Sequence, residues 1–360
     1  MIGIFLGLFE AAGIAGPFVF GHFADKMGRY KPGLLITNML VIAAAIPLIY
    51  VKSPIATALL AMVIGLGFRS ALPLLEAVTT IAIGSTGNYG RIRTAGSISY
   101  ILASLLLQSA LVLPPDTARN IGLWIAISAA MAAAAMGFIP QRYERVHPET
   151  DDGEAGSDTG AGAATPAGSI WSPLLTAALV IMALNRLGMT SIYGFFSLYL
   201  TNEIHWDAVG FMWALAATAE VPFMFLSRRI INRFGAFTCM TVSTGALTLR
   251  LLLYALFPIK GMIILAQLLH SLCFGLFHAS AIAVISDCVP PKRRALGMTL
   301  YMSLGSGVPT FLGNILGGFI VEHAGYRALY GVFSVFPLIA VGIYAGVVIQ
   351  RKRGGATARY

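Results

Sequence analysis

Six charged side chains lie well away from the ends of apolar segments long enough to cross a membrane in this 360-residue chain. A charge at the centre of a bilayer costs about 3 kcal/mol or more, so such residues normally face a cavity or an opposite charge. Three of the six are acids and three are bases. This balance predicts a network across a central cavity rather than six separate sites. The six are Glu10, Arg69, Glu76, Arg186, Glu220 and Arg250.

Spacing relates some of these residues to each other. Arg69 precedes Glu76 by seven residues, which puts both on one helix face about 10 Å apart, too far for direct contact. A solute or another helix could therefore bridge them. His270 and His278 lie eight residues apart near one face, and histidine titrates near neutrality, so both are candidates for a proton path. A plain packing role is the alternative for each histidine.

The elements that carry these residues are apolar helices. The chain is 57% hydrophobic and 11% charged, whereas a soluble domain has about 25% charged residues. One crossing takes about 20 apolar residues. We therefore predict an all-α polytopic membrane protein with eleven spans, at 2–21, 33–51, 56–83, 92–113, 121–138, 171–200, 206–226, 236–256, 262–289, 296–319 and 328–349.

Basic residues concentrate in alternate loops and in the C-terminal tail, and the positive-inside rule places those loops in the cytoplasm. The net charge of +9 then reports topology and contact with anionic lipid, not nucleic-acid binding. The C-terminus is expected in the cytoplasm of a plasma membrane, the inner one in a bacterium. The N-terminus is expected outside, and one further helix before Met1 would bring both ends inside.

A polar stretch divides the chain. Residues 140–170 are rich in Gly, Ala, Ser, Thr and acids, so they read as a cytoplasmic flexible linker. The predicted domains are an N-terminal half at 1–139 with five spans, a C-terminal half at 171–350 with six, and a basic tail at 351–360. Each half would hold six helices if one were missing in front.

Residues 21–31 (GHFADKMGRYK) resemble the signature loop between helices two and three of the major facilitator superfamily. Tyr30 departs from the signature by replacing a base. The resemblance implies the major facilitator fold, with the first family helix absent here. It also implies a loop whose contacts break and re-form as the two halves rock. The matching residues are Gly21, Asp25, Lys26, Gly28, Arg29 and Lys31.

Residues 71–77 (ALPLLEA) and 89–100 (YGRIRTAGSISY) are similar to the lactose permease branch, which includes phenylpropionate permease-like transporters. The resemblance implies that Glu76, Arg93 and Tyr100 bind substrate. A carboxylate and a guanidinium can grip hydroxyls or an anion, and an aromatic face suits a sugar or an aromatic ring. Arg69 and Asn185 are added as further candidates to line the cavity.

The C-terminal half resembles the same branch. Glu220, Arg250 and His270 match that branch's glutamate, arginine and histidine, and we assign them, with His278 and Glu10, to proton coupling. The essential glutamate three residues past the histidine is Cys273 here. Other charges of the branch are lost as matched pairs, which leaves no stranded ion. Their positions here are Gly194, Ser197, Gln267 and Pro309.

These observations predict a secondary active transporter of a small polar or amphipathic solute, such as a sugar, a nucleoside or an aromatic acid. By resemblance, it is a proton symporter working by alternating access. The alternatives are a proton-driven exporter of a drug or metabolite and a truncated relative that does not transport. An enzyme is disfavoured because no nucleophile, catalytic dyad or metal cluster stands out. No cofactor is expected beyond the proton gradient, and the chain is expected to be a monomer.

Overall fold

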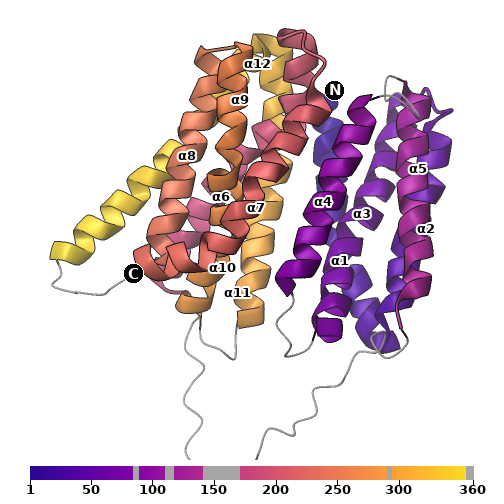
Figure 1. The fold of residues 1–360 in the computed structure, drawn as a ribbon, viewed down its shortest axis with the longest axis horizontal. Helices are drawn as coiled ribbons and strands as arrows, with labels where there is room; N and C mark the ends of the chain where they lie inside the picture. Colours follow the sequence, from indigo (N-terminus) through magenta and orange to yellow (C-terminus); the bar gives the residue numbers. More distant parts are fainter. Residues whose placement is uncertain (84–88, 110–116, 141–170, 290–293, 354–360) are drawn as a thin grey trace, which may run out of the picture.

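The computed structural model describes residues 1–83, 89–109, 117–140, 171–289 and 294–353. The described residues of the first half form five helices, drawn in indigo to purple in Figure 1. Thr117 and Ser172 cap helices by accepting a backbone N–H, as a residue at an N-cap commonly does. The first five helices are α1 (Ile2–Met27), α2 (Tyr30–Leu48), α3 (Pro54–Ile83), α4 (Tyr89–Ser109) and α5 (Ala118–Ala135), followed by a 3-10 turn at Met136–Phe138.

The second half contains longer and more broken helices. Three π-helical turns interrupt them, at Tyr199–Glu203, Ser271–Leu276 and Tyr301–Gly307. The longest helix breaks at Gly325, where φ is 79° and ψ is 179°. The helices are α6 (Pro173–Leu198), α7 (Val209–Phe234), α8 (Ala236–Leu256), α9 (Lys260–Leu268), α10 (Phe277–Cys288), α11 (Arg294–Leu300) and α12 (Val308–Arg353).

Helix lengths agree with a membrane-spanning chain. Among the described residues, eight helices are long and apolar enough to cross a membrane, or nine if α7, bent by 55° beyond Pro222, counts as one span. The longest, Gly297–Val347, has 51 residues, more than twice the length of about 20 that one crossing needs. The apolar part of α4, Ala95–Ser109, is shorter. Each of the eleven predicted segments therefore coincides with a helical stretch, although the bounds shift.

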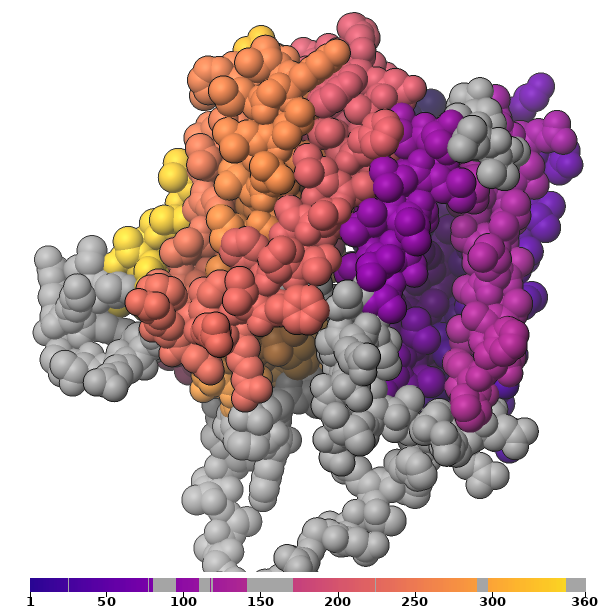
Figure 2. Space-filling view, in the orientation of Figure 1, coloured from indigo at the N-terminus to yellow at the C-terminus, as the bar shows by residue number. Residues whose placement is uncertain are grey.

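The helices form two groups that lie side by side in Figure 1, α1–α5 in one and α6–α12 in the other. Within the first group α3 packs on α1 and α2, and α2 packs on α5; within the second, α12 packs on α6 and α8. The groups meet where α1 touches α12 and α4 touches α7. Figure 2 shows α4 against α7 in the upper part of the view. Residues 141–170 of the linker predicted at 140–170 lie outside the described residues, so the domain boundaries stay a prediction.

Close helix contact between the groups requires glycine. The backbone of Gly3 on α1 approaches Gly318 on α12 so closely that a Cβ on either would collide with the other. Small residues permit such contacts between membrane helices. This contact accounts for glycine at both positions.

The signature loop is shorter than predicted. The first span was expected to end at residue 21, but α1 continues to Met27 and α2 begins at Tyr30, which leaves only Gly28 and Arg29 between them. Gly21 and Lys26 are therefore helical. The chain reverses at Gly28, whose φ of +64° is a left-handed conformation that glycine adopts at low cost. The side chain of Asp25 lies outside the described part.

Candidate functional site

A cavity of about 580 Å³ lies between the two groups of helices. Its lining includes side chains of α3, α4, α6 and α7 and of the turn that joins α9 to α10. Of the predicted site residues, Glu76, Tyr100, Glu220 and His270 line it. The structure thus brings together four residues that the sequence spreads over almost 200 positions, two from each group.

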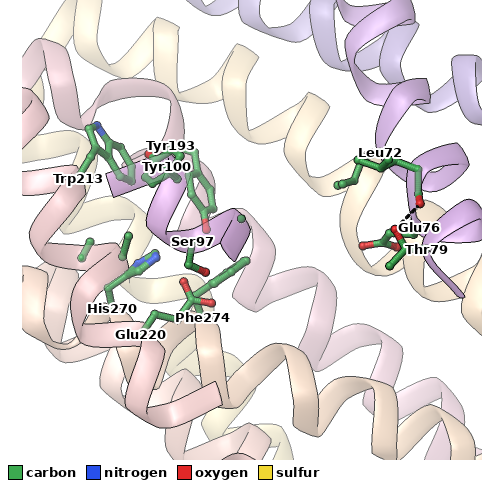
Figure 3. A pocket seen from close by; sticks show the side chains of 14 residues that line it. Leu72, Glu76, Thr79, Ser97, Tyr100, Tyr193, Trp213, Glu220, His270 and Phe274 are labelled. Atoms are coloured by element: carbon green, nitrogen blue, oxygen red, sulfur yellow. Dashed lines mark hydrogen bonds between the residues drawn. The ribbon is translucent and has the colours of Figure 1, made fainter. Parts of the chain in front are cut away.

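Two carboxylates are the acidic groups of this cavity. Glu76 belongs to α3 and Glu220 to α7, and Figure 3 shows them on opposite sides of the view, Glu220 beside Ser97 and Phe274. Both side chains are partly exposed. A Cβ at Gly275 would lie 3.0 Å from Cγ of Glu220, so this glycine lets α7 and the π-helical turn approach each other. Each group of helices therefore contributes one carboxylate to the same cavity.

Aromatic side chains form another part of the lining. Tyr193 on α6 and Trp213 on α7 are nearly parallel, with an angle of 4° and centroids 6.1 Å apart. Phe274 lies in the π-helical turn, nearly parallel to His270 and 5.4 Å from it. The sequence analysis missed Tyr193, Trp213 and Phe274. Their only signal was aromatic type inside an apolar helix, which core residues share.

Arg250 lies at the centre of a buried polar cluster next to the cavity. Its side chain is fully buried, and it donates to the Tyr254 hydroxyl at 3.1 Å, to Nδ1 of His270 at 2.9 Å and to Oε1 of Gln267. From the sequence, Arg250 was assigned to proton coupling. These hydrogen bonds instead hold the guanidinium in the packing of α8 against α9, with His270 as its link to the cavity.

Glu10 and Arg69 form an ion pair between α1 and α3. Arg69 was predicted to bind substrate and Glu10 to couple protons. Neither is among the residues that line the cavity. The guanidinium also lies 5.7 Å from the ring centroid of Phe9. The balance of acids and bases predicted pairs across the central cavity, but this pair lies between α1 and α3. Its position indicates that both residues hold α1 on α3.

Other predicted residues lie outside the cavity or outside the described part. Asn185 was predicted to bind substrate, but its side chain is buried between α6 and α8 and donates to Thr244 Oγ1 at 3.1 Å. His278 lies 3.3 Å from the Tyr301 hydroxyl and is not among the lining residues. The side chain of Arg93 lies outside the described part, so its role stays a prediction.

Metal chemistry has no support in the described residues. Among them, no three His, Cys, Asp or Glu side chains are grouped so that they could hold a metal ion. Cys239, Cys273 and Cys288 are not joined in disulfides in this part of the chain. The arrangement of carboxylates, aromatic rings and one imidazole around an open cavity is suited to binding a small organic solute.

The chain is similar to known proteins over most of its length. The profile described as "MFS_1 like family" matches residues 1–332. Maltose permease of Geobacillus stearothermophilus is 24% identical over 269 residues, 75% of this chain, which spans only 65% of that relative. The probable 3-phenylpropionic acid transporter of Escherichia coli is 23% identical over 352 residues, 94% of this chain and 86% of that protein.

Among solved structures, that of the nucleoside transporter NupG superposes on 96% of this chain and 89% of its own, with a TM-score of 0.75 at 17% identity. At this identity, the likeness shows the fold alone. It establishes the all-α transporter fold that the signature loop predicted.

Proposed function

Because the chain belongs to the MFS_1 like family, a family of multi-pass membrane transporters and not of enzymes, we propose that it moves a small organic solute across a membrane by alternating access. The solute would bind in the cavity between α1–α5 and α6–α12, and the two groups would rock about it. Uptake would be coupled to protons moving in the same direction, in a plasma membrane with the C-terminus in the cytoplasm. The lactose permease branch and an absent first family helix stay predictions.

The single observation that carries this proposal is a cavity lined from both groups of helices, with Glu76 from one and Glu220 from the other. A site at the interface of two halves changes its access when the halves move relative to each other. The relatives include proteins named for maltose and for 3-phenylpropionic acid, and the similar structure is of a nucleoside transporter. These names favour small organic solutes as cargo.

Glu220 is the best candidate for the proton carrier. Cys273 occupies the position where the lactose permease branch has its coupling glutamate, and it is a buried thiol. Two residues further on, Gly275 packs against the Glu220 side chain. A carboxylate from α7 therefore reaches the same turn from the neighbouring helix. Protonation of Glu220 would remove a charge from the cavity and alter the balance between the two access states.

The runner-up is an exporter that exchanges protons for a drug or metabolite. The same cavity and carboxylates serve either direction, so the direction of flux along a proton gradient distinguishes the two. In proteoliposomes, a symporter accumulates solute when protons flow inward, and an exchanger does so when protons flow outward.

The test uses the purified chain in proteoliposomes with a panel of maltose, 3-phenylpropionate and uridine under an imposed pH gradient. We expect accumulation of at least one solute by the unaltered chain. Glu220→Gln should abolish accumulation driven by the gradient but retain exchange of labelled for unlabelled solute. Glu203→Gln, which alters an exposed glutamate in the turn after α6, is the matched control and should behave as the unaltered chain. Unchanged accumulation in Glu220→Gln would remove Glu220 from the coupling role.

A further inference from the structure

The cavity presents a right-angled corner made of aromatic rings. Tyr193 and Trp213 share one orientation, at 4° to each other. His270 and Phe274 share another, at 9°. The Tyr193 ring stands at 85° to His270 and at 81° to Phe274. A flat ring placed in this corner could lie along one pair and meet the other edge to face, the two arrangements that aromatic rings prefer.

The rings of this corner are held in place before any solute arrives. The Trp213 indole donates from Nε1 to Ser197 Oγ at 3.1 Å, and its ring meets Phe196 edge to face at 5.7 Å. The guanidinium of Arg186 lies 5.4 Å from the Tyr193 ring centroid. Tyr193 is nevertheless 40% exposed, although most of its neighbours on α6 are buried. An exposed ring with fixed neighbours binds a ligand without a large entropy cost.

The polar groups of the cavity are mainly hydrogen-bond acceptors. Glu76 and Glu220 are carboxylates among its described lining residues. Hydroxyl, amide or ammonium groups of a solute would find acceptors there, whereas an ionised carboxylate of a solute would bring acceptors only. The imidazole of His270 adds one N–H donor, because its other ring nitrogen accepts from Arg250.

We propose that the cavity takes a solute that joins a flat ring to hydrogen-bond donors, and that it discriminates against solutes that lack either the ring or the donors. The inference rests on the proposed function, since it concerns the same cavity. The ring lies in the corner of Tyr193, Trp213 and Phe274, and the donors reach the carboxylates. Among the three solute classes considered from sequence, nucleosides fit this description, while plain sugars lack the ring and ionised aromatic acids lack the donors.

The test measures binding with two matched pairs of probes. Uridine and ribose share hydroxyl donors but only uridine has the ring; 3-phenylpropylamine and 3-phenylpropionate share the ring, but only the amine has hydrogen-bond donors. The readout is quenching of Trp213 fluorescence in a variant in which Trp124, Trp171 and Trp206 are phenylalanine. We expect uridine and the amine to bind at least tenfold more tightly than ribose and the acid. Equal or tighter binding of ribose or 3-phenylpropionate, or no binding of uridine and the amine, overturns the inference.

Substitutions of Trp213 test where the ring of the solute binds. Trp213→Leu should weaken uridine binding, followed by calorimetry, by about tenfold or more, which is the scale of stacking on one aromatic side chain. Trp213→Phe should retain most of it, because a ring remains. Trp206→Leu, which alters a tryptophan beside Lys260 and outside the cavity lining, is the control for folding. Equal losses in Trp213→Phe and Trp213→Leu would contradict stacking.

The binding inference and the transport proposal can be contradicted independently of each other. If 3-phenylpropionate binds most tightly and is accumulated along a pH gradient, transport stands and the requirement for donors is wrong. If uridine binds as expected but no solute crosses the membrane, the binding inference stands and the transport proposal is wrong.

Discussion

Arg250 on α8 donates from Nη1 to the imidazole Nδ1 of His270 at 2.9 Å, and this contact fixes the protonation of the histidine. A guanidinium carries only donors, so Nδ1 must accept and the ring proton lies on Nε2. Arg250 is fully buried and its charge is permanent. A second ring proton on His270 would break this hydrogen bond and place two positive charges together. The geometry therefore argues for a neutral His270 that binds solute, rather than the proton carrier predicted from sequence.

His270→Asn tests this assignment. Asparagine keeps a neutral donor but cannot reproduce the geometry, so solute binding should weaken about three- to tenfold, the value of roughly one hydrogen bond. The number of protons carried per solute molecule should not change. Both quantities follow from simultaneous measurement of proton and solute flux in proteoliposomes. Loss of proton coupling with unaltered solute binding would show that His270 carries the proton after all.

The sequence predicted the membrane helices because their signal is local. Apolar segments of transmembrane length and basic loops depend only on neighbours in the chain, and the predicted segments coincide with helices. The ends of the helices were harder to predict from the sequence; α1, for example, continues to Met27. Nothing local distinguishes the apolar residues that end a span from those that extend it beyond the hydrocarbon.

The cavity was predicted in part. Glu76 and Glu220 could be identified because an intramembrane carboxylate stands out against apolar neighbours. Tyr193 and Trp213 could not, because an aromatic residue in an apolar helix is equally at home in lipid, in the core or in a cavity. Asn185 was predicted to bind substrate for a related reason, because a polar side chain in an apolar helix needs a hydrogen-bond partner. In the structure that partner is Thr244. Only the packing of helices distinguishes these cases.

The ion pair of Glu10 with Arg69 should contribute to stability rather than to coupling. Its side chains are 14% and 38% exposed, so Glu10→Gln leaves a partly buried guanidinium without its counter-charge. We expect a loss of about 1–3 kcal/mol, below that of a fully buried pair. The measurement is thermal unfolding of the purified protein in detergent.

A double-mutant cycle provides the control for this pair. The double variant Glu10→Gln/Arg69→Gln lacks both charges. It should therefore be less destabilised than the single variant Glu10→Gln, in which Arg69 has no counter-charge. Proton coupling should persist in every variant that still folds. A Glu10→Gln protein with unchanged unfolding temperature and no coupling would return Glu10 to the proton path.

The turn at Gly28 gives a prediction with a matched control in the same helix–turn unit. Gly28→Ala should destabilise by about 1–2 kcal/mol because its φ of +64° is strained for any residue with a Cβ. Gly21→Ala should be neutral or stabilising, since Gly21 is helical and, like Gly28, has open space where the alanine methyl group would lie. Thermal unfolding of the two variants separates backbone strain from crowding. Equal effects of both substitutions would contradict the conformational explanation.

Gln108 joins the two groups of helices at one end of the cavity. Its side chain on α4 donates to the carbonyl oxygen of Asp207 at 3.2 Å and to Oδ1 of the same residue at 3.1 Å, and it accepts from Gly210 N–H at 2.7 Å. The pattern of basic loops predicts that this end lies outside the cell. Gln108→Ala removes these bonds and should shift the protein toward a state open to the outside, by about 1–3 kcal/mol or five- to 150-fold in population.

The measurement is the rate at which a membrane-impermeant maleimide, added from outside, labels Ala216→Cys in the cavity lining, with the three native cysteines changed to serine. Gln108→Ala should raise this rate at least fivefold. Asn202→Ala is the control, because Asn202 is an exposed amide in the same interhelical region whose bond to Tyr326 stays within one group of helices. It should leave the labelling rate unchanged. Equal acceleration in both variants would mean that the rate reports general loosening at this end, and that the Gln108 bonds do not hold the two groups together.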